Sequence, residues 1–151
     1  MKKQSCYSLN ISDKFLSEDI IRMKQKNLYQ LLKRLINNNI IYKNISFVIG
    51  ISNKDSSSSK VDYIYNFSKG KPKKRIIGKE VLWHFHIYII GDDFSSASSF
   101  CNMARQYISH KMGYKTSQNK NDDLIVALSY VHKQCISYWK YGEYFHSKKI
   151  G

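Results

Sequence analysis

The most regular hydrophobic pattern in the chain lies at 81–91, where β-branched and aromatic residues follow one another almost without interruption. Such a run, ended by a Gly-Asp-Asp sequence, is typical of a central β-strand that is covered on both faces. Side chains alternate along a strand, so every second residue shares a face. One face then carries Trp83, Phe85, Ile87 and Ile89, and the other carries Leu82, His84, His86 and Tyr88.

Weaker patterns predict two further strands and three helices. Alternating residues at 7–11 and an apolar run at 45–51 are typical of strands. Apolar residues recur at helical spacing over about 17–37, 95–110 and 124–139, and each stretch begins near a serine or aspartate that can cap a helix. These elements alternate along the chain, which favours a sheet that is packed against helices.

The intervening segments are mostly polar. Residues 52–60 and 113–121 are predicted to be loops, residues 61–67 to add a strand, and residues 140–151 to lack regular structure. No internal repeat and no domain boundary is evident. The order of elements predicts one α+β domain over residues 1–151, with an antiparallel β-sheet covered by helices.

The charge of the chain indicates what kind of partner it binds. The 151 residues include 25 Lys and Arg against 11 Asp and Glu, a formal net charge of +14. Such an excess on a small domain favours a polyanion, with nucleic acid ahead of an anionic membrane surface. A basic turn concentrates part of this charge and suggests the tip of a DNA-contacting hairpin, a nuclear-localisation signal or a solvated turn. Its cations are Lys71, Lys73, Lys74 and Arg75.

The chain shows no sign of a membrane segment or of a disulfide framework. No apolar run reaches the ~18–20 residues of a membrane span, and no signal peptide is evident at the basic N-terminus. The three cysteines, Cys6, Cys101 and Cys135, are odd in number and far apart. They are expected to be buried thiols in a reducing cytoplasm, which predicts a cytoplasmic protein without membrane contact.

The two strand histidines are candidate metal ligands. His84 and His86 project from one face about 6–7 Å apart at the backbone, which suits two ligands that converge on one divalent ion. Neutral imidazole nitrogen is the donor in such sites. The alternative is a pair of histidines on a half-exposed strand face that binds no metal.

A second group of reactive side chains lies on the last predicted helix. Tyr130, Lys133 and Gln134 are spaced i, i+3 and i+4 and therefore share one helical face. A phenol beside a bound metal can attack a phosphodiester, and a nearby lysine can stabilise the phenolate or the phosphate. The alternative is an ordinary tyrosine on an amphipathic helix.

Other tyrosines and histidines fit this chemistry less well. Tyr107, with Lys111 four residues later, is a rival nucleophile, but the face that it shares with Phe100 and Ala104 suggests core packing. Tyr138 is rotated roughly 80° from Tyr130 on a continuous helix, which argues against a mechanism with two tyrosines. Three histidines without partner spacing are expected to be surface residues or phosphate contacts: His110, His132 and His146.

The His84-Phe85-His86 sequence followed by Tyr130-x-x-Lys133 resembles the HUH endonucleases, and the rolling-circle replication initiators of small plasmids and viruses in particular. The resemblance extends to the order of elements over most of the chain. It implies a five-stranded antiparallel sheet, a divalent cofactor (Mg²⁺ or Mn²⁺), and nicking and joining of single-stranded DNA at a replication origin. It also implies a 5′-phosphotyrosine link, a free 3′-hydroxyl, and host replication proteins as further partners.

The chain departs from this family in its third metal ligand. Initiators usually have an acidic third ligand on the strand before the histidine strand or shortly ahead of the histidines, and here Glu80 is about 13 Å from His84 if the strand is straight. Single-tyrosine transposases of the superfamily use a polar residue four positions after the tyrosine, where this chain has Gln134. Gln134 is therefore the first candidate and Glu80 the second. Two alternative functions remain: a transposase or relaxase with this site, and a nucleic-acid-binding domain without catalysis.

Overall fold

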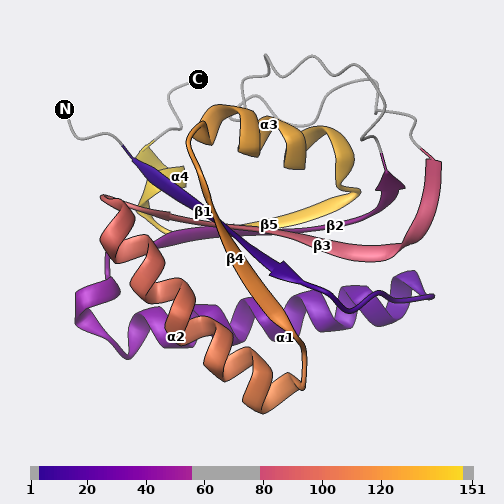
Figure 1. Cartoon of the computed structure of the whole chain (residues 1–151), viewed down its shortest axis with the longest axis horizontal. Helices are drawn as coiled ribbons and strands as arrows, with labels where there is room; N and C mark the ends of the chain where they lie inside the picture. The colour runs from indigo at the N-terminus through magenta and orange to yellow at the C-terminus, as the bar shows by residue number, and fades with distance from the viewer. Residues whose placement is uncertain (1–3, 56–78, 148–151) are drawn as a thin grey trace.

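The computed structural model describes residues 4–55 and 79–147, which form an α+β fold around a five-stranded open sheet (Figure 1). Neighbouring strands are antiparallel, in the order β4-β1-β3-β2-β5. The strands are β1 (Ser5–Ile11), β2 (Ser46–Asp55), β3 (Lys79–Gly91), β4 (Thr116–Asn121) and β5 (Ser137–Tyr141). The histidine strand β3 is the middle strand, so the predicted antiparallel α+β architecture with a central strand at 81–91 is confirmed.

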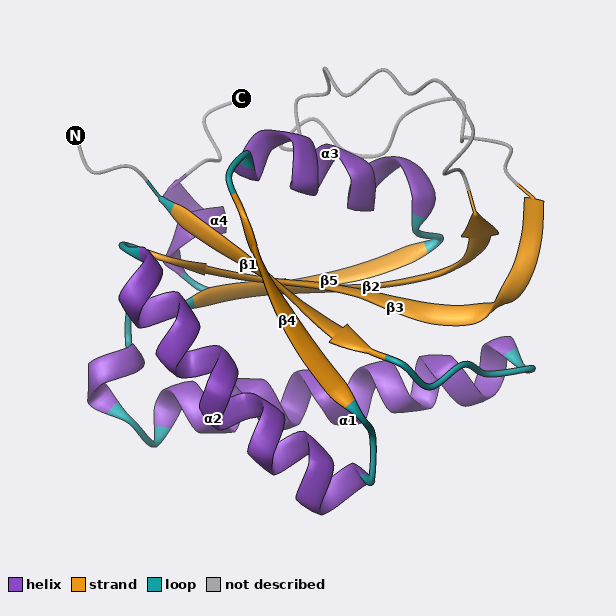
Figure 2. Ribbon diagram, in the orientation of Figure 1, coloured by secondary structure: helices purple, strands orange, loops and turns teal. Residues whose placement is uncertain are grey.

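Helices cover both faces of this sheet. They are α1 (Glu18–Asn37), α2 (Phe94–Met112), α3 (Leu124–Gln134) and α4 (Glu143–Ser147), with a short 3₁₀ turn η1 (Ile40–Tyr42). Figure 2 shows α1 and α2 below the sheet and α3 above it. Within the described ranges 4–55 and 79–147, no helix has the length and apolar content needed to cross a membrane.

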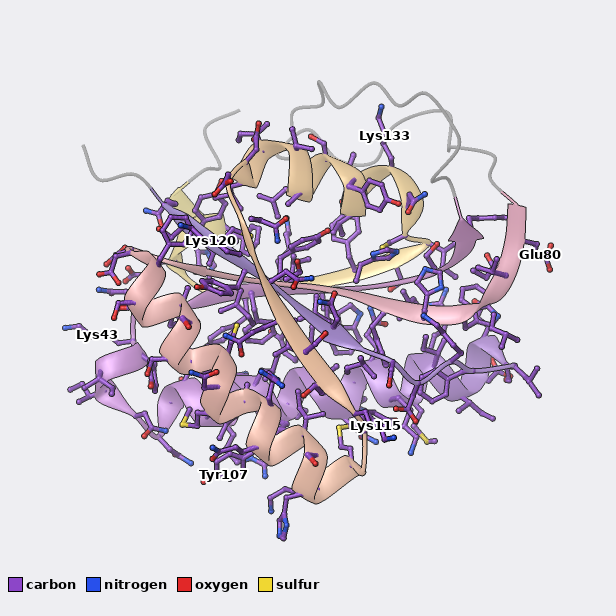
Figure 3. The ribbon with its side chains drawn as sticks, viewed as in Figure 1. Lys43, Glu80, Tyr107, Lys115, Lys120 and Lys133 are labelled. Carbon is purple, nitrogen blue, oxygen red and sulfur yellow. The ribbon has the colours of Figure 1, made fainter. Side chains whose placement is uncertain are left out.

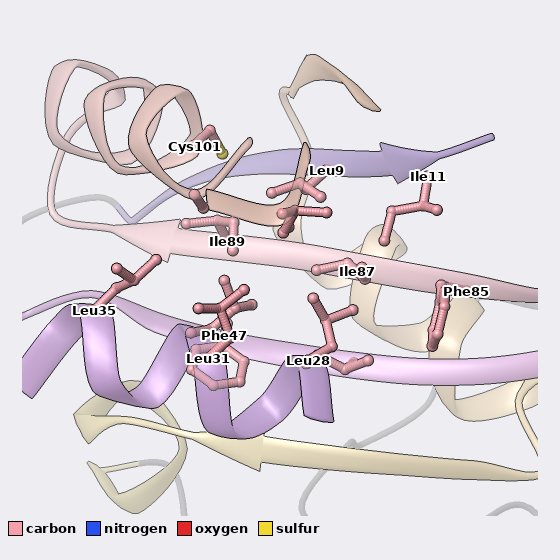
Figure 4. Packing of buried hydrophobic residues seen from close by; sticks show 14 of the residues in the cluster. Leu9, Ile11, Leu28, Leu31, Leu35, Phe47, Phe85, Ile87, Ile89 and Cys101 are labelled. Carbon is pink, nitrogen blue, oxygen red and sulfur yellow. The ribbon is translucent and has the colours of Figure 1, made fainter. Parts of the chain in front are cut away.

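The main core lies between the sheet and the α1–α2 layer. Alternation along β3 turns Phe85, Ile87 and Ile89 into this core, as predicted (Figure 4). They meet Leu28 of α1 and Phe100 of α2, which are both fully buried. Burial of each such side chain contributes roughly 1.5–3 kcal/mol, so this layer fixes how β3 is oriented. The opposite face of β3, which carries the histidines, is left to face α3.

Side-chain caps define where the three long helices begin. The Ser17 hydroxyl accepts a hydrogen bond from the Ile20 N–H (3.3 Å), and Asp93 and Asp123 accept likewise from Ser96 (2.7 Å) and Val126 (3.0 Å). Each cap satisfies a backbone donor that the first helical turn leaves unpaired. The predicted helix starts are therefore confirmed to within a few residues.

Two element assignments from the sequence are wrong. The predicted loop 113–121 contains β4, whose side chains are all polar and give no hydrophobic alternation. It is an edge strand, held by backbone pairing with β1 on one side only. Residues 52–55 of the predicted loop 52–60 belong instead to β2, which continues to Asp55, and the rest of that loop lies outside the described residues. The predicted strand 61–67 and the basic turn Lys71 to Arg75 lie outside the described residues.

The predicted helix 124–139 is also too long. It ends at Gln134, because Cys135 takes an extended conformation (φ −83°, ψ 136°). Ile136 N–H then donates to the Ile51 carbonyl (3.0 Å), and β5 follows as a partner of β2. Residues 137–141 are rich in aromatic side chains that suit strands, and the unpaired edge of β2 decides their conformation. The region 140–151, expected to be irregular, contributes the end of β5 and α4.

The three cysteines are free thiols and are buried, as predicted. Cys6 and Cys101 are almost inaccessible, and burial raises the pKa of each to about 12. Thiols with such pKa values are protonated near neutral pH and are poor nucleophiles and poor metal ligands. Cys135 belongs to a smaller core between α3 and the sheet, together with Val48, Ile90, Leu128 and Val131.

Candidate metal and nucleophile site

The two strand histidines converge on one point. Both rings are half-buried on the α3 side of β3, and their Nε2 atoms are 3.1 Å apart. His84 Nδ1 lies 2.9 Å from the Leu82 carbonyl oxygen. Because a carbonyl only accepts, Nδ1 of His84 is the donor in this contact, so in the neutral ring Nε2 presents the lone pair. This backbone contact is the kind that orients an imidazole as a metal ligand.

The separation of these nitrogens fits one divalent ion. Two nitrogens bound at right angles to an ion, with bonds of about 2.1 Å, lie about 3.0 Å apart. Burial, followed by the neighbouring His84 and Lys14, lowers the pKa of His86 to about 3. His86 is therefore neutral at physiological pH, the protonation state that a ligand needs.

Helix α3 adds a phenol and an amide to the same pocket. The Tyr130 ring lies against His86, with ring centroids 5.5 Å apart and an interplanar angle of 69°. Gln134, one turn later, is buried. The pocket has a volume of about 490 Å³. It is lined by Lys14, Lys54, Val81, Leu82, His84, His86, Tyr130 and Gln134.

The side-chain amide of Gln134 lines this pocket together with the two imidazoles. Among the residues that the structure describes, no group of three or more His, Cys, Asp or Glu side chains is placed to hold a metal. An amide oxygen is an acceptable ligand for hard divalent ions such as Mg²⁺ and Mn²⁺. Two imidazoles and one amide therefore fit such an ion, with further positions left for substrate oxygen or water.

A glycine in β2 allows α3 to approach the sheet this closely. Gly50 lies opposite His86 in the β2–β3 register. A Cβ atom at Gly50 would overlap Cys135 Sγ and would lie 3.2 Å from Val131 Cγ1. A larger residue would therefore push α3, with Tyr130, away from the histidines.

Gly50→Ala is expected to destabilise the protein by about 1–3 kcal/mol, because the added methyl group overpacks the contact between β2 and α3. Chemical denaturation of wild type and variant measures this loss. Cys135→Ala removes the sulfur that the methyl group meets, so the double variant should recover part of the loss in a double-mutant cycle. Equal denaturation midpoints for Gly50→Ala and wild type would contradict the close approach of α3.

Of the predicted site residues that the structure describes, Lys133 and Glu80 do not line the pocket. Lys133 is buried, and Figure 3 shows its side chain extending from α3 away from the sheet. The Glu80 side chain is 75% exposed, lies 3.7 Å from Lys54 Nζ, and points outward at the end of β3 (Figure 3). Strand β3 bends near this end, where its register with β2 shifts, but Glu80 is not among the residues that line the pocket. The structure thus brings Gln134 to the histidine pair and leaves Glu80 outside.

The rival residues lie elsewhere. Tyr107 is on α2, across the sheet from the histidines. Its side chain is 41% exposed, so the prediction that it packs in the core is wrong. His132 is buried and its Nδ1 is 2.8 Å from the Tyr138 hydroxyl, so its prediction as a surface residue is wrong. This contact ties α3 to β5 and helps to fix the helix end that carries Gln134. His110 and His146 are exposed.

Two lysines of the pocket, Lys14 and Lys54, have no counterpart in the sequence-based prediction. No local pattern signals Lys14, because an isolated bridge between Phe15 and Trp83 brings its segment to β3. Lys54 follows Gly50 and Ser52 on the same strand face, and this spacing was the available signal.

Comparison of the chain with known protein families, curated proteins and solved structures finds no match. The resemblance to HUH endonucleases therefore rests on the short sequence motifs.

Proposed function

We propose that this domain is an HUH-type endonuclease that nicks and rejoins single-stranded DNA. The observation that carries the proposal is the convergence of His84, His86, Tyr130 and Gln134 in one pocket, with the two Nε2 atoms 3.1 Å apart. Paired imidazoles beside a tyrosine are a donor set for a metal-assisted nucleophilic reaction at phosphorus. The net charge of +14 supports a polyanionic substrate.

The reaction is a transesterification in which Tyr130 is the nucleophile. Its phenol oxygen forms a bond to phosphorus, the bond from phosphorus to the 3′ oxygen breaks, and the phenol proton ends on that oxygen. The products are a 5′-phosphotyrosine and a free 3′-hydroxyl, with no water consumed. Attack by a 3′-hydroxyl on the phosphotyrosine reverses these changes and joins strands.

The remaining pocket residues hold and orient the reacting groups. His84, His86 and Gln134 would hold a Mg²⁺ or Mn²⁺ ion, which when bound polarises the scissile phosphate and balances its developing charge. The Leu82 carbonyl keeps the His84 ring in the orientation that directs Nε2 into the pocket. The contact between Tyr130 and His86 holds the phenol beside these donors, so the nucleophile is already positioned.

The free 3′-hydroxyl links this chemistry to replication. A polymerase can extend that end while the protein keeps the 5′ end, which is the first step of rolling-circle replication. The substrate is therefore proposed to be a single-stranded origin of a small plasmid or virus, with host replication proteins acting on the exposed 3′ end.

The test is covalent capture of DNA. The full chain is incubated with a mixture of single-stranded oligonucleotides and Mn²⁺, then boiled in detergent and run on a denaturing gel. A protein band shifted by the mass of a DNA fragment is expected, and it should vanish when EDTA replaces Mn²⁺ or when the oligonucleotides are annealed to complements. Binding of the oligonucleotides without any adduct, over a range of sequences and of both metals, would favour a DNA-binding domain without catalysis.

A further inference from the structure

Two cations reach the pocket from separate parts of the chain. Lys14 lies in the segment after β1, which a two-way backbone bridge fixes to β3: Phe15 N–H donates to the Trp83 carbonyl (2.9 Å), and Trp83 N–H donates to the Phe15 carbonyl (2.8 Å). The Phe15 ring turns into the core and contacts Phe85 at 5.7 Å between centroids. Because neighbouring side chains in an extended segment point to opposite sides, Lys14 faces the pocket that it lines.

Lys54 reaches the pocket from the neighbouring strand. Gly50 and Ser52 of β2 lie opposite His86 and His84, so these β2 positions share the face of the histidines. Lys54 is two residues further along and lines the pocket. It pairs with Glu80 across the strands at 3.7 Å, and its side chain is 34% exposed. Lys14 and Lys54 thus lie on either side of β3, one on each neighbouring segment.

The pairing of Lys54 with Glu80 is weak enough to exchange. Glu80 is largely exposed, and an ion pair of this kind contributes about 0–1 kcal/mol. A phosphate that enters the pocket can replace the carboxylate as the partner of Lys54. Lys14 lines the pocket together with both histidines, so its cation is available to the same phosphate.

We propose that Lys14 and Lys54 form a phosphate-binding subsite that holds the scissile phosphodiester, and that Glu80 competes with this phosphate for Lys54. This inference rests on the proposed function, because that function supplies the phosphodiester ligand. It transfers to Lys14 and Lys54 the role that the Tyr130-x-x-Lys133 spacing suggests for Lys133. It also gives Glu80 a role opposite to that of a metal ligand, since its removal strengthens substrate binding.

The first measurement is binding of a fluorescent single-stranded oligonucleotide in EDTA, over a range of salt concentrations. Lys14→Ala and Lys54→Ala should each weaken binding and reduce the slope of log K against log salt by about 0.7, the loss of one phosphate contact. Lys54→Arg should retain the slope. Lys43→Ala is the matched control, because Lys43 is exposed and lies at the opposite end of the molecule from Glu80 (Figure 3). Glu80→Gln should tighten binding several-fold.

The second measurement is the single-turnover rate of adduct formation at saturating DNA with Mn²⁺. Lys14→Ala and Lys54→Ala should slow this rate by about tenfold to a hundredfold, whereas Lys43→Ala should leave it unchanged. Equal slopes and rates for the pocket variants and Lys43→Ala would overturn the subsite. Weaker Mn²⁺ binding in Glu80→Gln would overturn the competition with phosphate and assign Glu80 to the metal.

The two proposals fail in distinguishable ways. If the wild-type protein forms an adduct and both lysine variants match it, the subsite is wrong and the nicking function stands. If the wild-type protein forms no adduct, the nicking function is wrong. The salt slopes then still decide whether Lys14 and Lys54 bind phosphate.

Discussion

Tyr130→Phe is expected to fold, to bind Mn²⁺ and single-stranded DNA as the wild-type protein does, and to form no covalent adduct. The substitution keeps the ring that packs against His86, at 5.5 Å between centroids, and removes only the oxygen that would attack phosphorus. Metal ligands and phosphate contacts are untouched, so the loss falls on the chemical step alone. A denaturing gel for the adduct, with fluorescence anisotropy for binding, checks both halves of this expectation.

Tyr107→Phe is the matched control for this substitution. Tyr107 lies on α2, across the sheet from the pocket, and loses the same atom from an exposed site. It should form the adduct at the wild-type rate. Peptide mapping of the wild-type adduct should place the DNA on Tyr130. Full activity in Tyr130→Phe, or DNA mapped to Tyr107 or Tyr138, would contradict the assignment of the nucleophile.

His84→Ala and His86→Ala are each expected to abolish metal-dependent nicking while most of the salt-sensitive DNA binding remains. Each removes one of the two Nε2 atoms that converge at 3.1 Å, so affinity for Mn²⁺ should fall by more than about 100-fold. The general attraction of a basic protein for DNA does not depend on either ring. Calorimetric titration with Mn²⁺ measures the first effect, and anisotropy measures the second.

The exposed His110 on α2 provides the control for this pair. His110→Ala should bind Mn²⁺ and nick DNA as the wild type does. Gln134→Ala should weaken Mn²⁺ binding more than Glu80→Ala, because Gln134 lines the pocket and Glu80 points outward. Cleavage at the wild-type rate by either strand-histidine variant would remove the metal from the mechanism.

The elements that could be predicted are those that bury an apolar face. The run at 81–91 specifies a central strand because only a strand with covered faces accommodates so many β-branched and aromatic residues. β4 could not be predicted, since its six residues are all polar and it is held by pairing with β1 and by hydrogen bonds from Arg105 of α2, which are contacts between distant parts of the chain. The end of α3 also depends on distant residues. Pairing with the edge of β2 makes residues 137–141 a strand, where the local pattern predicts the continuation of the helix.

The residues of the candidate site also fall into those that local patterns predict and those that contacts between distant parts of the chain bring in. Alternation along β3 predicts that His84 and His86 share a face, and helical spacing predicts that Tyr130 and Gln134 share another. That the two faces meet was implied only by the resemblance to HUH endonucleases, and all four residues line one pocket. The helical-spacing rule fails for Lys133. The rotation at which α3 packs on the sheet directs Lys133 away from the pocket that Tyr130 and Gln134 line. Lys14 reaches the pocket only through the bridge between Phe15 and Trp83, a contact between distant parts of the chain that no local pattern encodes.

Helix α3 leads directly into the edge strand β5, so the site is built from an interior strand and from a segment at the edge of the sheet. The histidines belong to the middle strand of the sheet, whereas Tyr130 belongs to a peripheral segment whose strand pairs with β2 alone. Peripheral segments open locally at lower free energy than interior strands. In the proposed reaction, local opening of α3 would carry the Tyr130 phosphotyrosine, together with Gln134, towards a new 3′-hydroxyl while His84 and His86 stay on the middle strand. Amide hydrogens of α3 and β5 should accordingly exchange faster than those of β3.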